Sequence, residues 1–409
     1  MLEPGPDGAL AVGRGDPHIR DVPASSFRPA VSRLSLTDFR GYGALRFEAD
    51  DRPVVLSGEN GAGKTNLLEA ISFLAPGRGL RRAKLAEIDR RVPPARATEV
   101  APGAWTIAAR IATADGPIQV GTGRDAASPS GERRIVKIDG AKAKTQAELA
   151  HLAHLVWLTP QMDRLFIEGS SGRRRFLDRL VLGFDAGHAT RLSTFEHALK
   201  ERARLLREGP ADPAWLATLE ETLAADGIAV TAARQTLVAR LDAACAAAEG
   251  PFPSAVLTLK GEIETMLGAM PALAAEDELR RRLAAARKSD GESGTTAVGP
   301  HRSDLVVHDR ASGMAAALCS TGEQKALLIS IVLAHARLEW QVAGVPPILL
   351  LDEVAAHLDA GRRAALFTAL TEIAAQAWLT GTDAALFAPL MGTAQFFTVA
   401  DAAVVPTRI

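Results

Sequence analysis

One glycine-rich stretch constrains this chain of 409 residues more than any other feature. It fits the pattern G-x-x-x-x-G-K-[ST] and reads Gly58, Glu59, Asn60, Gly61, Ala62, Gly63, Lys64, Thr65. Four apolar or small residues at 54–57 precede it and indicate a buried strand, and residues 66–71 indicate the start of a helix. A phosphate-binding loop requires this order of strand, loop and helix.

The chemistry of the loop predicts that it binds ATP together with Mg²⁺. Its glycines let the backbone turn with positive φ, so that N–H groups and a helix N-terminus converge on an anion. We expect Lys64 to reach the β- and γ-phosphates and the hydroxyl of Thr65 to ligate Mg²⁺. Asn66, which opens the helix, completes the set of residues predicted to bind the nucleotide.

A pair of carboxylates far along the chain indicates that the nucleotide is hydrolysed. Four apolar residues, 348–351, lead directly into Asp352 and Glu353, which predicts a buried strand with both acids at its carboxyl end. We expect Asp352 to hold the Mg²⁺ shell and Glu353 to orient or deprotonate the attacking water. Strands that end in an acidic turn are common, but beside a phosphate-binding loop this pair indicates an ATPase, with Lys64 and Glu353 as catalytic residues.

A second group that suits an anion lies just upstream, in the stretch "CSTGEQKALLISIVLAHARLEW". Here Ser320 and Gly322 stand at the start of a long apolar helix and offer a hydroxyl, a backbone N–H and a helix N-terminus. Since the chain already has one phosphate-binding loop, this second group is expected to close on the nucleotide of another subunit.

Composition narrows the setting in which the protein works. The charges nearly cancel, with 47 Lys and Arg against 48 Asp and Glu, so a nucleic-acid partner must be met by local patches. The two cysteines form neither a disulfide framework nor a metal-ligand pattern, which fits a reducing compartment. No apolar run has the length of a membrane span, and the N-terminus lacks a signal-peptide pattern, so we expect a cytoplasmic protein without a membrane partner.

The remaining pattern predicts an α/β head with an inserted helical arm. Residues 1–30 are rich in Gly, Pro and Asp and are expected to be disordered. Alternating segments at 34–47 and 105–138 predict antiparallel strands, and the apolar stripes of 188–248 predict a pair of helices separated at 209–213. A further helix is expected at 276–288, followed by a loop, before strands and helices return from 305.

Several motifs resemble the RecF family of ABC-type ATPase heads, and the resemblance covers nearly everything after residue 31. They are "FRGY" at 39–42, "GKTNLLEAI" at 63–71, "PGRGLRRAKLAE" at 76–87, "LTPQMDRLFIEGSSGRRRFLDRL" at 158–180, "VGPHRSDL" at 298–305 and "TGTD" at 380–383. The family implies a head formed by residues 31–185 and 296–409, with an arm at 186–295 between them.

The resemblance also implies a function in recombinational DNA repair. Proteins of this family dimerise on ATP, bind double-stranded DNA near single-strand gaps, and work with RecR and RecO to help load RecA. Slow, DNA-stimulated hydrolysis of ATP then resets the dimer. The alternative is the ATPase subunit of another DNA-maintenance complex or of a transporter. A structural chromosome protein is disfavoured, because the arm is too short for a long coiled coil.

The family assigns roles to further residues. Ser320, Gly322 and Gln324 act on the partner's ATP, and Asp359 lies across the dimer interface. Arg40, in the same motif as Tyr42, sits near the nucleotide, and Gln161 is the candidate for the metal-sensing loop. The switch position, His in transport ATPases, falls among residues 380–382 and has no imidazole, and "AH" at 356–357 replaces the Ser-Glu frequent in the family.

The basic residues offer candidate contacts to DNA phosphates. The cluster predicted to bind DNA is Arg78, Arg81, Arg82, Lys84. Two other clusters occur at 173–175 and 280–288, and each of the three could instead be paired within the protein. The chain has one Tyr and scattered Trp residues, so stacking on single strands is not indicated and contact with a duplex backbone is favoured.

Overall fold

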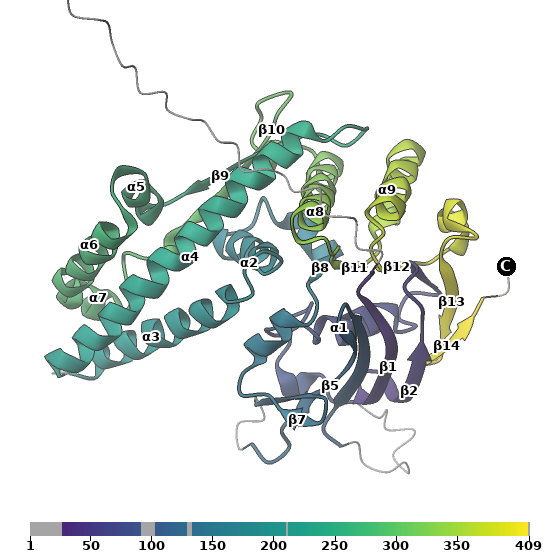
Figure 1. Ribbon diagram of the computed structural model, residues 1–409, viewed down its shortest axis with the longest axis horizontal. Coiled ribbons are helices and arrows are strands. Elements are labelled where there is room, and N and C mark those ends of the chain that lie inside the picture. Colours follow the sequence, from purple (N-terminus) through teal and green to yellow (C-terminus); the bar gives the residue numbers. More distant parts are fainter. Residues whose placement is uncertain (1–26, 91–102, 129–132, 210–211, 408–409) are drawn as a thin grey trace, which may run out of the picture.

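The glycine-rich loop extends from the centre of a six-stranded sheet in the computed structural model, which describes residues 27–90, 103–128, 133–209 and 212–407 (Figure 1). The strand order is β14-β13-β3-β12-β11-β8, and all neighbours are parallel except β13 and β14. The strands are β3 (Val54–Ser57), β8 (Leu155–Leu158), β11 (Ile348–Leu351), β12 (Ala377–Gly381), β13 (Gln395–Ala400) and β14 (Ala403–Pro406). This order places β12 between the strands that lead to the loop and to Asp352.

The central strands are mostly apolar because each face packs into a different core. Val54 and Leu56 face one hydrophobic cluster, whereas Val55 between them faces another. Strands buried on both faces read as continuous apolar runs, as the sequence of 348–351 also does. The predicted strands at 54–57 and 348–351 are therefore confirmed.

A second six-stranded sheet is antiparallel, in the order β2-β1-β4-β5-β6-β7. It comprises β1 (Ala30–Phe39), β2 (Tyr42–Glu48), β4 (Thr106–Thr113), β5 (Gly116–Arg124), β6 (Arg134–Ile138) and β7 (Ala141–Lys142). The expected hairpin is confirmed, because Leu34 faces Phe47 and Leu36 faces Leu45 across it. Helix α1 (Lys64–Ser72) shares a hydrophobic core with both sheets. The predicted disorder of residues 1–30 concerns mostly residues 1–26, outside the described part, and Ala30 already belongs to β1.

The other face of the parallel sheet is covered by α2 (Ser170–Val181), α8 (Thr321–Ala343) and α9 (Ala360–Ile373). Within the described residues, α8 is the one helix long and apolar enough to cross a membrane. Of its most apolar window, 67% is buried inside the protein, so α8 has the character of a core helix. Short 3-10 helices connect these elements: Leu85–Glu87, Gln146–His151, Pro160–Arg164, Pro300–Arg302, Ala316–Leu318, Val354–His357 and Ala384–Leu390.

The inserted arm is a group of helices at the left of Figure 1. It contains α3 (His188–Glu208), α4 (Pro213–Ala247), α5 (Glu262–Ala269), α6 (Ala272–Ala285) and α7 (Arg287–Ser293), with β9 (Ala255–Lys260) paired to β10 (Asp304–Asp309). The 35 residues of α4 span about 52 Å. The predicted domain boundaries at 185 and 295 remain predictions, because α4 also contacts α2 and α8 of the head.

One element differs from the sequence prediction. A single helix was expected at 276–288 with a loop after it, but α6 ends at Ala285 and α7 occupies the expected loop. The reason is tertiary, because the buried carboxylate of Asp290 accepts a hydrogen bond from the buried guanidinium of Arg202 at 2.7 Å. This ion pair joins α7 to α3 across 88 residues of sequence, a contact that the local composition of the segment does not reveal.

Candidate functional site

The glycines of the phosphate-binding loop are required for two different reasons. A Cβ on Gly58 would lie 2.3 Å from the carbonyl oxygen of Val399, and a Cβ on Gly63 would lie 2.6 Å from the hydroxyl of Tyr42. Gly61 has no atom within 4 Å of that position, but its φ of +84° is one that L residues rarely adopt. Gly58 and Gly63 also have positive φ, of +151° and +111°, so the backbone requires glycine at all three positions and close packing adds a second requirement at Gly58 and Gly63.

The side chain of Lys64 folds back onto this loop. Its ammonium donates hydrogen bonds to the carbonyl oxygens of Gly58 at 2.7 Å and Glu59 at 2.9 Å. Burial lowers the pKa of Lys64, while the negative charges of Glu353 and Asp352 oppose the shift. The loop therefore holds a cation at its centre, where a phosphate group would require one.

The two residues predicted to bind the metal ion, Thr65 and Asp352, contact each other. The hydroxyl of Thr65 donates to Oδ1 of Asp352 at 3.0 Å, and the hydroxyl of Thr380 donates to the same oxygen at 2.7 Å. Burial raises the pKa of Asp352, whereas these two hydrogen bonds lower it. A hydroxyl and a carboxylate are hard oxygen ligands of the kind that Mg²⁺ prefers, so Thr65 and Asp352 fit the ion.

Glu353 adopts a strained backbone conformation beside this group. Its φ is +51° and its ψ is +27°, in the left-handed region that non-glycine residues seldom occupy. The N–H of Glu353 donates to Oγ1 of Thr380 at 2.9 Å. Backbone strain of this kind persists where the surroundings fix it, and such sites cluster at active centres. Thr380 thus contacts the carboxylate of Asp352 and the backbone N–H of Glu353. Which of residues 380–382 takes the switch position stays a prediction.

Arg40 and Arg81 converge on the helix that follows the loop. The buried carboxylate of Glu69 accepts from Arg40 at 2.7 Å and from Arg81 at 2.8 Å, and Arg81 also donates to Oδ1 of Asn66 at 2.7 Å. The hydroxyl of Tyr42 donates to the carbonyl of Gly63 at 3.2 Å. Tyr42 therefore contacts the loop, and Arg40 contacts α1, the helix that follows it. That Arg40 lies near the nucleotide stays a prediction.

The predicted DNA-binding cluster is divided by this arrangement. Arg81 is engaged with Glu69 and Asn66, while Arg82 and Lys84 are exposed, and no ion pair of theirs occurs in the described part of the chain. Arg78 is exposed and makes an interaction within the protein. The cluster is thus not a uniform patch of free cations.

The residues expected to act on a partner's nucleotide are only partly at the surface. Ser320 caps α8, and its N–H and hydroxyl both donate to Glu323 at 2.8 Å. Gly322 is exposed, but Gln324 is buried and donates to the carbonyl of Cys319 at 2.8 Å. Asp359 is exposed and caps α9. The side chain of Gln324 would have to leave its buried position to reach a ligand outside the chain.

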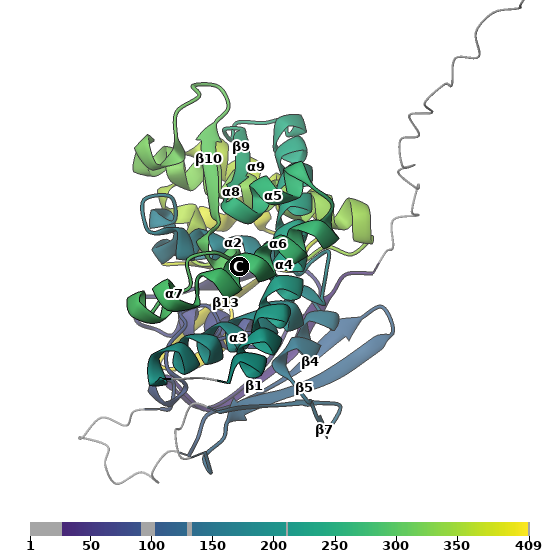
Figure 2. The same ribbon diagram turned by 90° about the vertical axis from the view of Figure 1, so that its left-hand side faces the viewer.

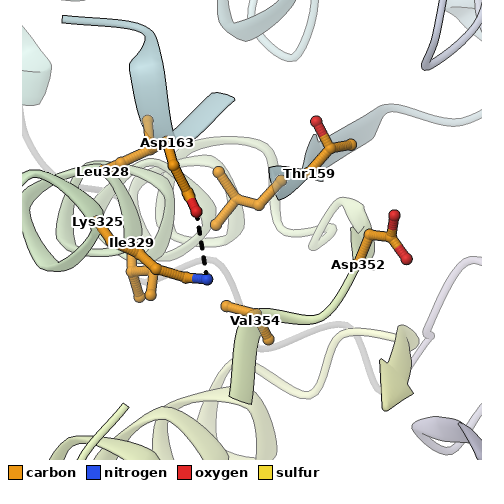
Figure 3. A pocket seen from close by; sticks show the side chains of 8 residues that line it. Thr159, Asp163, Lys325, Leu328, Ile329, Asp352 and Val354 are labelled. Atoms are coloured by element: carbon orange, nitrogen blue, oxygen red, sulfur yellow. Dashed lines mark ion pairs between the residues drawn. The ribbon is translucent and has the colours of Figure 1, made fainter. Parts of the chain in front are cut away.

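A narrow pocket connects the start of α8 with the acid-bearing strand (Figure 3). Asp163 and Lys325 point toward each other across it, with 3.5 Å between Oδ2 and Nζ, and Asp352 lies on the opposite side. Asp163 belongs to the same short helix as Gln161, which is exposed. The ion pair therefore ties the candidate metal-sensing loop to the helix that begins after Ser320.

Substitution of Gly63 tests the packing of the loop. We expect Gly63→Ala to lower the free energy of unfolding by roughly 1 to 3 kcal/mol and to weaken ATP binding, because the new methyl group meets Tyr42. Chemical denaturation and equilibrium nucleotide titration measure the two effects. Gly61→Ala is the matched control, since it introduces strain without a clash, and equal losses in both variants would contradict the packing argument.

The fold and the site together define a P-loop ATPase head of the ABC type. The chain matches the family model described as RecF/RecN/SMC N terminal domain over residues 30–390. It is 50% identical to the DNA replication and repair protein RecF of Mesorhizobium japonicum over 380 residues, 92% of this chain and 98% of that protein. The protein of the same name from Rhizobium etli is 49% identical over 374 residues, 91% of this chain and 97% of the relative. The chain belongs to the RecF family.

Solved structures agree with this fold. The recombination mediator protein RecF, in a structure described as RecF-ATPrS in the RecFOR pathway, matches with a TM-score of 0.78 and 21% identity. The match covers 94% of this chain and all of that one. The Smc head domain of Pyrococcus furiosus, with an extended coiled coil, matches with a TM-score of 0.52 and 15% identity over 93% of this chain and 96% of that one. The predicted fold class is thus confirmed.

Proposed function

We propose that the protein is an ATP-dependent DNA-binding protein of recombinational repair, which dimerises on ATP and resets by slow, DNA-stimulated hydrolysis. The observation that carries the proposal is the convergence of Lys64, Thr65, Asp352 and Glu353 at one edge of the parallel sheet. Curated relatives that cover nearly the whole chain are named DNA replication and repair proteins, which supports the biological setting.

Each residue of the site has a separate role in ATP hydrolysis. Lys64 and the backbone of residues 58–65 bind the phosphates and offset the charge that develops on them. Thr65 and Asp352 would hold Mg²⁺, which when bound draws charge from the phosphate oxygens. Glu353 orients and deprotonates the attacking water, and its fixed backbone limits the positions that its carboxylate can reach.

Dimerisation is supported by the presence in one chain of two separate halves of a nucleotide site. The phosphate-binding loop forms one half, and Ser320 with Gly322 at the start of α8 forms the other. In the part of the chain that the structure describes, no hydrogen bond or ion pair joins them. Two chains arranged symmetrically would bring each half to the other, and Asp359 would then lie across the interface.

The proposed partners are double-stranded and gapped DNA, RecR and RecO, and through them RecA. The support is that solved relatives are described as belonging to the RecFOR pathway, although the likeness to those structures is one of fold. We propose a cytoplasmic location. The alternative, an ATPase subunit of another DNA-maintenance complex or of a transporter, has less support, because relatives named RecF cover nearly all of this chain.

The proposal is tested by measuring protein mass and binding to a gapped duplex with ATP, with ADP and without nucleotide. We expect ATP to produce a dimer that retains the duplex, because ligand binding at a shared interface shifts the monomer–dimer equilibrium. Ser320→Arg places a bulky cation in the second half-site and should abolish the dimer while ATP binding persists. A monomer in ATP, or DNA binding indifferent to nucleotide, would contradict the proposal.

A further inference from the structure

The outer face of the antiparallel sheet is open to solvent. On β4, Ile107, Ala109 and Ile111 are buried, whereas Thr106, Ala108 and Arg110 alternate with them and are exposed. This face belongs to the sheet at the lower right of Figure 1, whereas the arm helices α3, α6 and α7 lie at the left, and Figure 2 gives a second view of the sheet. Alternation along a strand places one side in the core and the other in water.

Basic residues occupy this outer face on five of the six strands. We name them the basic sheet face: Arg33, Arg46, Arg110, Lys137 and Lys142. Glu48 is the one acidic residue among the outward positions of the described strands, and it pairs with both Arg33 and Arg46. Arg110, Lys137 and Lys142 have no ion pair among the described residues. The face therefore has an excess of positive charge, although the whole chain has a net charge of −1.

Cross-strand pairing makes these charges unfavourable to the sheet itself. Arg33 lies directly opposite Arg110, and Lys137 lies directly opposite Lys142. Like charges directly opposite each other destabilise a sheet. Glu48 relieves the first pair, but the lysine pair has no such neighbour in the described part of the chain. A bound anion would relieve both.

Small residues lie between the charges on this face. Ala108 of β4 is paired with Ser35 of β1 on one side and with Gly121 of β5 on the other, and Gly121 is paired with Lys137 of β6. With strands about 4.8 Å apart and about 3.4 Å between residues, Arg110 and Lys137 stand roughly 12 Å apart. That separation is comparable with the major-groove width of about 12 Å, so the two residues can reach phosphates on both sides of a groove.

The side chains favour a duplex over other anionic partners. The outward positions of these strands carry hydroxyls and cations but no aromatic side chain, so bases of a single strand would have no ring to stack on. The basic cluster of the arm is less available, since Arg280, Arg281 and Arg282 each pair with a carboxylate on the arm. We propose that the basic sheet face binds the phosphate backbone of double-stranded DNA. This inference rests on the proposed function, because that function makes duplex DNA the ligand.

The test is the variant Arg110→Gln/Lys137→Gln/Lys142→Gln, measured for affinity to a blunt duplex across a salt series in ATP. Each phosphate contact contributes about 0.9 to the salt slope, so loss of three contacts should reduce the slope by about 2 to 3 and weaken binding roughly tenfold or more. ATP binding and the mass of the dimer should not change, since the three residues lie outside the nucleotide site.

The matched control removes three exposed charges from the arm, as Lys200→Gln/Arg240→Gln/Lys288→Gln. We expect the control to keep the slope of the natural protein. An unchanged slope in the sheet variant, an equal reduction in the control, or a single strand that competes better than a duplex would overturn the inference. If the natural protein does not bind DNA in ATP, the proposed function itself fails, which is a separate result.

Discussion

Glu353→Gln should abolish steady-state ATP hydrolysis while leaving ATP binding intact. The amide has nearly the shape of the carboxylate but cannot accept a proton from the attacking water. A positioned general base contributes typically 10²- to 10⁴-fold to the rate, so we expect kcat to fall by at least about a hundredfold. Lys64, Thr65 and Asp352, which bind the nucleotide and its metal in the proposed function, are unchanged.

The same variant should prolong the ATP-bound dimer, because hydrolysis is the proposed step that separates the subunits. Single-turnover kinetics and the mass of the protein after ATP is diluted measure the two effects. Glu59→Gln is a useful control, because it removes a carboxylate from the phosphate-binding loop. Lys64 contacts the backbone carbonyl of Glu59 and not its side chain. If Glu353→Gln hydrolysed ATP at the natural rate, another group would have to be the base.

The sequence predicts the local parts of this site well because each is a contiguous motif. The loop at 58–65 carries its own requirement for glycine, and the flanking β3 and α1 follow from apolar pattern over a few residues. The strand before Asp352 is recognisable for the same reason, since burial on both faces demands an unbroken apolar run. Antiparallel alternation likewise revealed β1, β2, β4 and β5.

Features that depend on long-range packing could not be predicted in the same way. The sequence does not state that β12 lies between β3 and β11, so the contact of Thr380 with Asp352 emerges only from the strand order. The ion pair of Arg81 with Glu69 is a second example. The sequence shows Arg81 as one member of a basic cluster, whereas the structure places its guanidinium against a buried carboxylate. Gln324, expected to face a partner, is drawn into the core by the carbonyl of Cys319.

The basic sheet face illustrates the same limit. Its five residues are spread from 33 to 142 and form no cluster in the sequence. Strand pairing alone brings Arg33 opposite Arg110 and Lys137 opposite Lys142. The net charge of the chain therefore gives no sign of this positively charged face, which forms only when the strands pair in register.

Thr380→Val should lower kcat roughly 10- to 100-fold with little change in the KM for ATP. The valine keeps the shape of threonine but removes the hydroxyl that donates to Asp352 at 2.7 Å and accepts from the N–H of Glu353 at 2.9 Å. Groups that orient a metal ligand typically contribute 10- to 100-fold to metal affinity or activity. The free Mg²⁺ needed for half-maximal rate should therefore rise, because Asp352 loses one of its two hydroxyl partners.

Two companion variants separate positioning from general stability. Thr380→Ser keeps the hydroxyl and should restore most of the rate, while Thr368→Val alters an exposed threonine of α9 and should have no effect. The lost partner of the Glu353 N–H should also cost about 1 to 3 kcal/mol of stability. If Thr380→Val lost stability but kept its kcat and Mg²⁺ dependence, Thr380 would be a purely structural residue. The strained backbone of Glu353 makes that result unexpected, since the hydroxyl of Thr380 is the group that anchors its N–H.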